Sequence, residues 1–282
     1  MDDLDKKTAV VTGAASGIGR AMCLRFGEAG MNVVLADVDD DKLNSVTDEV
    51  AALGVGAIGV HTDVADSAAN VALLDATIDE FGQANVVCLN AGVTGAIGRS
   101  WALSEEDWDW TLGILVKGVV NGIRAFVPHL IEHGDGHVVT TGSIAGHVSG
   151  AFGAPYNVGK HSVVTMTEAL YHELKAEDSP VGVTCLCPGF VNTNIVVATT
   201  ERRNAGLAGT SSDERGDRYV EMSARALAGG LDPTVVGQQV LDAILANQFW
   251  LFTDFRWDEA ISKRTEEIVG RKAPTIGLPS KG

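Results

Sequence analysis

Thr12-Gly13-Ala14-Ala15-Ser16-Gly17-Ile18-Gly19 is the stretch from which the fold of this chain can be inferred. It follows an apolar run from Thr8 to Val11 and precedes apolar residues at helical spacing, so its glycines stand where a strand turns into a helix. Gly13 permits the tight turn, Gly17 lets backbone approach a ligand, and Gly19 lets the helix pack closely on the strand. The N–H groups of the first helical turn, together with the positive end of the helix dipole, can bind a diphosphate. The stretch predicts a nucleotide-binding turn rather than a glycine-rich loop without a ligand.

Short apolar runs alternate with longer helical patterns over most of the 282 residues. Strands are predicted at residues 8–11, 32–36, 57–60, 85–89, 137–141, 181–186 and 249–252. Helices are predicted after Gly19 and at residues 40–53, 67–81, 105–130, 154–176 and 233–246. Such alternation predicts an α/β fold, a Rossmann-type doubly wound parallel sheet of about seven strands with helices on both faces. Because no linker interrupts the pattern, residues 1–282 are expected to form a single dinucleotide-binding and catalytic domain.

Two regions depart from the alternation. Residues 192–231 are polar, dotted with glycine and long, and they follow the carboxyl end of a predicted strand. Ligands of such sheets lie at that edge, so we interpret this insertion as a lid over the substrate. Residues 255–282 form a C-terminal tail that ends in a Pro/Gly-rich stretch.

Composition narrows the class of partner. The net charge of −16 argues against nucleic acid and anionic membranes. We expect no apolar run to reach the length of a membrane span, and the acidic N-terminus does not resemble a secretory signal. The four cysteines lack zinc-site spacing, so we predict no metal and four buried apolar side chains in a reducing cytoplasm.

Asp37 closes the second predicted strand, eighteen residues beyond Gly19. An acid at this point of a dinucleotide-binding unit accepts hydrogen bonds from the adenosine ribose and repels a 2′-phosphate. No basic residue adjoins it, and Ser16 rather than a basic residue precedes Gly17. These features favour NAD over NADP. Further cofactor contacts are expected after the third and fourth strands, at Asp63, Val64, Asn90, Ala91 and Gly92.

Tyr156 and Lys160 stand four residues apart at the start of a predicted helix and so share one face. Ser143 ends the fifth strand, at the same edge of the sheet. Alcohol oxidation needs a base, and a tyrosine can serve only if its pKa falls well below about 10. A neighbouring ammonium lowers that pKa, and a serine hydroxyl can hold the substrate oxygen. Alone, the Tyr/Lys pair would be an ordinary surface pair; together with the glycine turn and Asp37 it predicts a catalytic site.

As a set, these motifs resemble the short-chain dehydrogenase/reductase family, in its simple single-domain branch. The matching motifs cover about residues 6–253 and are Thr12-Gly13-x-x-x-Gly17-x-Gly19, Asn90-Ala91-Gly92, Ser143, Tyr156-x-x-x-Lys160 and Pro188-Gly189. The resemblance implies that Tyr156 is the general base or acid, that Lys160 lowers its pKa and binds the nicotinamide ribose, and that Ser143 orients the substrate. It further implies that NAD contacts Gly13, Ser16, Gly17, Ile18, Gly19, Pro188, Gly189, Val191 and Thr193. It also implies a homotetramer or homodimer formed through the long helices 105–130 and 154–176.

One position departs from the family pattern. The family's fourth catalytic residue is an asparagine thirteen residues before a helix proline, and counting back from Pro128 gives Leu115. That asparagine helps to hold a water of the proton relay, and leucine cannot hydrogen-bond a water. Asn121 lies on a different helix face and is a poor substitute. Three interpretations are open. The proton relay runs through another water and activity is retained, activity is slowed at the proton-exchange step, or the chain binds the cofactor without catalysing a reaction.

The sequence thus predicts an NAD-dependent oxidoreductase that interconverts a secondary alcohol and a ketone. The length of the insertion suggests a bulky apolar substrate, cyclic, aryl or steroid-like. Val93, Thr94 and residues 144–152 are candidate pocket residues, and His147, Arg202 and Arg203 are weaker candidates for substrate contacts. The alternatives are a non-catalytic NAD-binding sensor or scaffold and, less favoured, an NADP-dependent carbonyl reductase.

Overall fold

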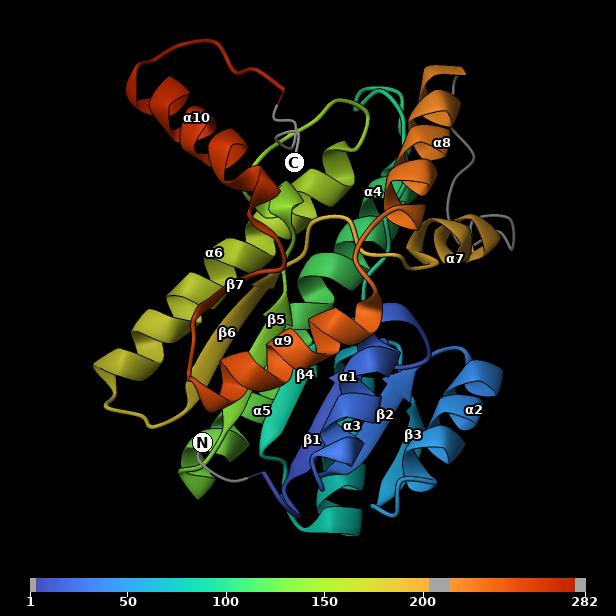
Figure 1. Cartoon of the computed structure of the whole chain (residues 1–282), viewed down its shortest axis with the longest axis vertical. Helices are drawn as coiled ribbons and strands as arrows, with labels where there is room; N and C mark the ends of the chain where they lie inside the picture. Colours follow the sequence, from blue (N-terminus) through green and yellow to red (C-terminus); the bar gives the residue numbers. More distant parts are fainter. Residues whose placement is uncertain (1–3, 203–213, 277–282) are drawn as a thin grey trace.

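A computed structural model describes residues 4–202 and 214–276, which are built around one parallel sheet (Figure 1). Its seven strands lie in the order β3-β2-β1-β4-β5-β6-β7. The strands are β1 (Thr8–Thr12), β2 (Asn32–Asp37), β3 (Ala57–His61), β4 (Val86–Leu89), β5 (His137–Thr141), β6 (Gly182–Cys187) and β7 (Trp250–Phe252). This confirms the predicted doubly wound sheet. Strands β1 to β3 are added towards one edge and β4 to β7 towards the other, so the strand order reverses between β1 and β4.

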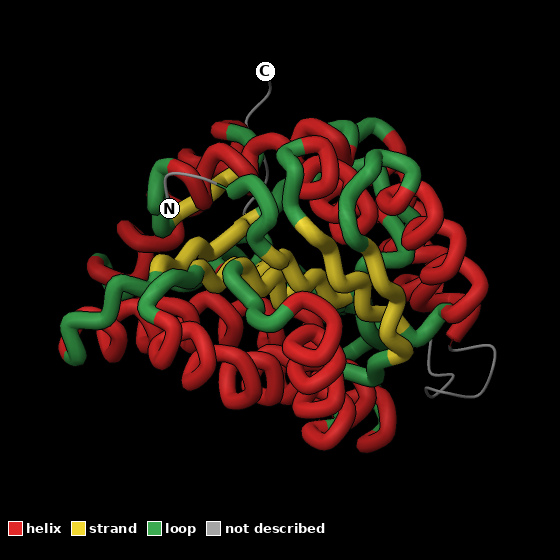
Figure 2. The backbone as a smooth tube through the Cα atoms, turned by 90° about the horizontal axis from the view of Figure 1, so that it is seen from below, coloured by secondary structure: helices red, strands yellow, loops and turns green. Residues whose placement is uncertain are grey.

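Helices cover both faces of the sheet, as the edge-on view in Figure 2 shows. One face is covered by α1 (Gly17–Glu28), α2 (Asp40–Ala51) and α9 (Pro233–Leu245). The other is covered by α3 (Ser67–Phe81), α5 (Gly118–His133) and α6 (Ala154–Ala176). Successive strand residues serve opposite faces: Val11 packs with the first set of helices and Val10 with the second.

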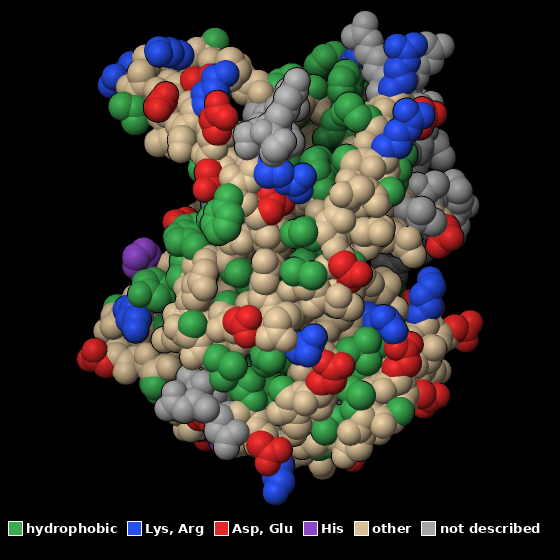
Figure 3. Space-filling view, in the orientation of Figure 1, with side chains coloured by type: hydrophobic (Ala, Val, Ile, Leu, Met, Phe, Trp, Pro, Cys, Tyr) green, Lys and Arg blue, Asp and Glu red, His purple; other side chains and the backbone are tan. Residues whose placement is uncertain are grey.

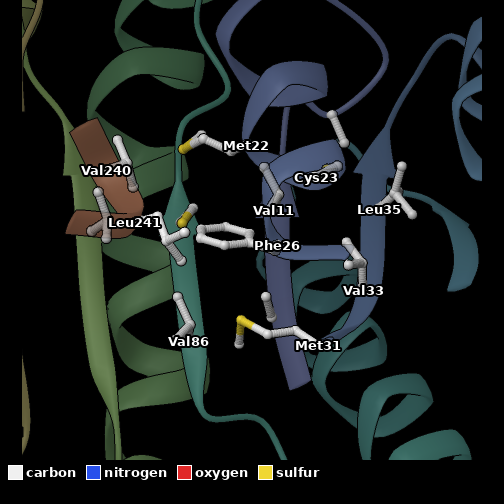
Figure 4. Packing of buried hydrophobic residues seen from close by; sticks show 14 of the residues in the cluster. Val11, Met22, Cys23, Phe26, Met31, Val33, Leu35, Val86, Val240 and Leu241 are labelled. Atoms are coloured by element: carbon white, nitrogen blue, oxygen red, sulfur yellow. The ribbon is translucent and has the colours of Figure 1, made fainter. Parts of the chain in front are cut away.

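Figure 4 shows the core on the α1 side, where Phe26 lies between α9 and the strands. Phe26 is fully buried, and burial of such a side chain stabilises the fold by roughly 1.5–3 kcal/mol. Because α1 begins directly at the glycine turn, this packing also fixes the position of the turn. All four cysteines are buried, as predicted, and none forms a disulfide.

The predicted helix 105–130 is interrupted. The structure has α4 (Glu105–Leu112), one π-helical turn (Gly113–Lys117) and then α5. The N–H of Gly118 donates to Gly113 O, one residue further back than in an α-helix. Amphipathic spacing alone does not reveal such a turn, which is set by the packing of the segment on α6.

The combined segment Glu105–His133 is, among the described residues, the one helix long and apolar enough to cross a membrane, contrary to the expectation from sequence. In its most apolar window 56% of the residues are buried inside the fold. Val119, Phe126 and Leu130 pack against the sheet, as in the core helix of a globular protein.

The insertion and the tail contain helices that the sequence analysis did not predict. The insertion forms α7 (Ile195–Arg202) and α8 (Glu214–Ala228), and the tail forms α10 (Asp258–Val269) after a 3₁₀ turn, Phe255–Trp257. The polar composition of α8 and α10 gave little apolar signal of a helix. Residues 203–213 and 277–282, parts of the predicted lid and tail, lie outside the described residues.

Candidate active site

A cleft opens at the carboxyl ends of the strands, at the point between β1 and β4 where the strand order reverses. Every residue predicted for catalysis or cofactor binding lines it: Gly13, Ser16, Gly17, Ile18, Gly19, Asp37, Asp63, Val64, Asn90, Ala91, Gly92, Ser143, Tyr156, Lys160, Pro188, Gly189, Val191 and Thr193. The parallel strands deliver these residues to one edge although they are far apart in sequence.

The glycine turn has the geometry of a cradle for a diphosphate. Gly13 and Gly17 adopt φ of +67° and +53°, which side chains rarely tolerate. A β-carbon at Gly19 would collide with the Gly13 carbonyl, so helix and strand meet as closely as predicted. Ser16 is the N-cap of α1, yet its side chain makes no capping hydrogen bond, and the first turn has no acidic residue. The positive end of the helix therefore fits the diphosphate of a dinucleotide.

Asp37 lies at the end of β2 beside this turn. Its Oδ2 accepts the N–H of Ala15 at 3.1 Å, and its Oδ1 accepts those of Val38 and Asp39 at 2.8 and 3.2 Å. These bonds hold the carboxylate at the cleft wall, where its remaining lone pairs can accept hydroxyl groups. The nearby cation Lys42 is bound by Asp39, its Nζ lying 2.6 Å from Oδ2.

Asn90 joins the three central strands beneath the cleft. Its Nδ2 donates to Thr12 O at 3.0 Å on β1, and its Oδ1 accepts the Thr141 hydroxyl at 3.1 Å from β5. The Thr12 hydroxyl in turn accepts the N–H groups of Asn90 and Ala91. The Asn-Ala-Gly motif therefore holds the cleft floor as well as lining it.

The loop after β3, which lines the cleft, is fixed from α5. Asn121 Nδ2 donates to the carbonyls of Val64 and Ala65 at 3.0 and 3.2 Å. Its side chain is thus committed to the loop after β3 and does not replace the expected asparagine, as the sequence analysis anticipated. Asp63 turns this loop by accepting the N–H of Ala65 at 2.9 Å.

Ser143, Tyr156 and Lys160 converge from β5 and the start of α6. Pro155 occupies the first turn of α6, where no N–H is needed. Lys160 Nζ lies 5.7 Å from the centre of the Tyr156 ring and donates to Thr141 O at 2.7 Å. The Ser143 hydroxyl accepts the N–H of Ala145 at 3.0 Å, which fixes its direction.

Burial shifts the pKa values of both ionisable groups. Burial lowers the pKa of Lys160 to about 8, because the ammonium is removed from water. Burial raises the pKa of Tyr156, and a hydrogen bond with Ser143 opposes that rise. A positive charge beside the phenol would lower the Tyr156 pKa further, so the pair has the electrostatics of a proton-transfer site.

Leu115 occupies the π-turn behind this pair, and its side chain is 1% exposed. A β-carbon at Gly92 would lie 3.3 Å from Leu115 Cδ2, and one at Gly159 would lie 2.8 Å from Cδ1. The leucine therefore packs between the Asn-Ala-Gly loop and α6, directly behind Lys160.

The segment after β6 forms another wall of the cleft. Thr193 lies over the glycine turn, its Cγ2 3.0 Å from where a Gly17 β-carbon would be. Gly189 is packed from behind by Asp254 and Trp257, so the tail supports this loop. Trp257 is buried against Phe190, with ring centres 5.5 Å apart.

Sequence reasoning missed several lining residues: Val38, Thr62, Ile114, Thr141 and Gly142. Two further lining residues, Ile195 and Leu227, belong to the insertion 192–231 that the sequence analysis interprets as a lid over the substrate. Thr141 and Gly142 carry a signal that could have been used, since they end β5 beside Ser143. His147 faces away, its Nε2 3.3 Å from Cys187 Sγ. The side chain of Arg202 and all of Arg203 lie outside what the structure describes.

Comparison with known proteins agrees with this geometry. The family model described as short chain dehydrogenase matches residues 7–204. A 1-deoxy-11-beta-hydroxypentalenate dehydrogenase of Streptomyces exfoliatus is 36% identical over 253 residues, 89% of this chain and 84% of that protein. A C alpha-dehydrogenase of Sphingobium is 28% identical over 99% of this chain and 90% of its own length. A short chain dehydrogenase/reductase of Burkholderia phymatum, solved in complex with NAD, superposes with a TM-score of 0.94 at 37% identity over 99% of both chains. The chain belongs to the short chain dehydrogenase family and is an oxidoreductase of that family.

Proposed function

We propose that this protein is an NAD-dependent dehydrogenase that interconverts a secondary alcohol and a ketone. The observation that carries the proposal is the convergence of Ser143, Tyr156 and Lys160 on the same cleft as the glycine turn. The family binds a nicotinamide cofactor, and the first turn of α1, Asp37 and the Asn-Ala-Gly loop fit one. Bound NAD would supply the hydride acceptor.

The chain's own residues would handle the proton and the substrate oxygen. Ser143 would orient the carbinol oxygen, and Tyr156 would take its proton in oxidation and return one in reduction. Lys160 would lower the Tyr156 pKa through its charge and hold the ribose next to the nicotinamide. The Thr141 carbonyl would keep the ammonium in place through the 2.7 Å hydrogen bond.

The position of Asp37 supports NAD over NADP. A carboxylate held by three backbone amides cannot swing away from a 2′-phosphate, and two such charges repel. The Burkholderia structure was solved with NAD, whereas a metagenomic family structure 26% identical to this chain was solved with NADP. Cofactor choice therefore depends on local residues, and here these favour NAD.

The rival function is that of a non-catalytic NAD-binding sensor or scaffold, and Leu115 is the observation that favours it. The three groups that would perform the chemistry are all present and brought together, so we favour catalysis. A bulky cyclic or aryl substrate is consistent with the names of relatives, which include a 1-deoxy-11-beta-hydroxypentalenate dehydrogenase and a (2S)-[(R)-hydroxy(phenyl)methyl]succinyl-CoA dehydrogenase subunit.

We also propose a cytoplasmic homotetramer or homodimer, without nucleic-acid or membrane partners. The net charge of −16 argues against nucleic acid and anionic membranes as partners, and Figure 3 shows basic side chains interspersed with acidic ones on the face displayed. Subunits would meet through segments 105–130 and 154–176, and Val158 in the second of these is 45% exposed.

The test is a screen of cyclic, aryl and steroid secondary alcohols with NAD or NADP, followed by the absorbance of the reduced cofactor. We expect NADH from at least one alcohol class, and Tyr156→Phe should abolish turnover while NAD binding persists. Turnover retained in Tyr156→Phe would contradict the mechanism. Tight NAD binding without turnover by wild type would support the sensor, and Leu115→Asn would then be assayed for activity.

A further inference from the structure

The inner face of α8 forms a wall that runs from the cleft, at Leu227, to the loop before α6, at Tyr219. Leu227 lines the cleft, and Tyr219, Val220 and Ser223 precede it on the same side of the helix, each of them partly buried. The opposite side is exposed and carries Arg218, Glu221, Met222 and Arg225. Eight residues of helix separate Tyr219 from Leu227, so this wall extends for about 12 Å. At the same end of the molecule, Figure 3 shows hydrophobic side chains gathered between α10 and α8.

Tyr219 packs on the loop that leads into the catalytic helix. Its hydroxyl lies 3.8 Å from the positions that β-carbons of Gly150 and Gly153 would take, which is ordinary van der Waals contact with this loop. Gly153 is the N-cap of α6 and precedes Tyr156 by three residues. The Tyr219 phenol is also near enough to Tyr156 to raise its pKa, although burial raises it more. Tyr219 therefore lies near Tyr156, against the loop that precedes it.

Phe152 completes an aromatic pair with Tyr219. The two ring centres are 6.4 Å apart and the planes are inclined by 52°. Phe152 has φ of +65°, a strained value for a residue with a side chain, and its carbonyl accepts the N–H of Gly98 at 2.9 Å. Backbone strain of this kind costs about 1–3 kcal/mol and persists where the surroundings enforce it. The strained loop fixes the Phe152 ring opposite α8.

We propose that Tyr219 and Phe152 are specificity-determining residues that bind a flat, uncharged ring attached to the carbinol carbon of the substrate. The side chains named for this wall, Phe152, Tyr219, Val220, Ser223 and Leu227, carry no charge, so the ring they accept is neutral. Ring–ring contact adds to the area buried, which distinguishes a ring from an open chain of equal size. This inference rests on the proposed dehydrogenase function, of which it names the substrate class.

The test compares 1-indanol, whose carbinol lies on a fused aromatic ring, with 2-butanol. Tyr219→Leu keeps an apolar side chain but removes the ring, and it should lower kcat/KM for 1-indanol about tenfold or more while changing that for 2-butanol by less than threefold. Tyr219→Phe keeps the ring and should stay within about threefold for both alcohols. Tyr171→Phe is the matched control, because it removes the hydroxyl of a tyrosine further along α6.

A second readout does not depend on turnover. Binding of 1-indanone to the NAD-loaded protein, followed by saturation-transfer NMR, should weaken by a similar factor in Tyr219→Leu and in Phe152→Leu. Equal losses of kcat/KM for both alcohols, or unchanged indanone binding, would overturn the proposal that Tyr219 and Phe152 bind a ring (the ring wall). α8 would then be a purely structural element. Absence of any turnover by wild type, together with indanone binding that depends on Tyr219, would remove the proposed dehydrogenase function and retain the ring wall.

Discussion

Leu115 fills the space that a side chain at Gly159 would need. A β-carbon on Gly159 would lie 2.8 Å from Leu115 Cδ1 and 2.9 Å from Leu115 Cβ, closer than real β-carbon contacts. Gly159 immediately precedes Lys160, so the leucine and the glycine together set how closely α6 approaches the π-turn. The departure from the family's asparagine is therefore accommodated by a neighbouring glycine.

Gly159→Ala should lower the free energy of unfolding by about 1–3 kcal/mol, because the added methyl overpacks a closed contact. Leu115→Ala in the same chain should recover part of that loss, since it removes Cδ1 and Cγ, two of the three Leu115 atoms that the methyl meets, and leaves Cβ. Urea denaturation of the wild type, both single variants and the double variant measures the coupling. Gly113→Ala is the control, because its added carbon meets Ala65 at an ordinary 3.8 Å. Additive effects of the two substitutions would show that the pair is not coupled.

Asp37→Ser should raise the ratio of NADP to NAD activity by at least about tenfold, because a charge that repels the 2′-phosphate is removed. The matched control is Asp41→Ser, an exposed acid on the first turn of α2, which should leave the ratio unchanged. The measurement is kcat/KM with each cofactor at one fixed alcohol concentration. An unchanged ratio in Asp37→Ser would support the NADP-dependent alternative.

Lys160→Met should move the pH dependence of alcohol oxidation to higher pH. Oxidation needs deprotonated Tyr156, so its rate rises as the pH rises through the Tyr156 pKa. Burial raises that pKa, and the Lys160 ammonium, which persists below its own pKa of about 8, opposes the rise. Loss of the ammonium would therefore raise the Tyr156 pKa in that range by about one unit or more. The measurement is log kcat/KM between about pH 6 and pH 10.

Lys175→Met is a matched control for the lysine. Lys175 Nζ lies 5.7 Å from the Tyr171 ring centre, the same distance as that between Lys160 Nζ and the Tyr156 ring centre, but further along α6. Its pH profile should coincide with that of the wild type. A Lys160→Met profile lowered at every pH without a shift would mean that the lysine acts by holding the ribose alone.

His137 should make the fold sensitive to acid. It is 2% exposed at the start of β5, and burial lowers its pKa to about 4 from the ordinary value of 6.5. Because the folded-state pKa lies below the unfolded one, the unfolded chain binds more protons between these values. Stability is then complete above pH 6.5 and falls as the pH drops towards 4, by up to about 3 kcal/mol.

His137→Gln should flatten this dependence. Urea midpoints at about pH 7 and pH 5 should differ less in the variant than in the wild type, even if the variant is less stable at both. His61→Gln serves as the control, because His61 is exposed at the end of β3. An equal fall in wild type and His137→Gln would assign the acid sensitivity to other groups.

Local patterns in the sequence determined the sheet, the glycine turn and the catalytic pair. The alternation of apolar runs and helical periods predicted all seven strands to within a residue or so, because buried parallel strands leave a continuous apolar signal. The shared helix face of Tyr156 and Lys160 was predictable because four residues is about one helical turn. The glycine turn was predictable because the backbone geometry at Gly13, Gly17 and Gly19 admits little else. These features depend on neighbours in the chain.

The tertiary structure alone decided what depends on residues far apart. The π-turn at Gly113–Lys117 arises where this segment packs on α6, and the Leu115–Gly159 contact joins residues 44 positions apart. The helix α8 has a polar composition, and its inner face acquires meaning only where Tyr219 meets Phe152 and Leu227 reaches the cleft. Such contacts are set by the way the whole chain packs around the sheet. They could not be predicted from the sequence, because packing between distant segments leaves no periodic signal in either segment.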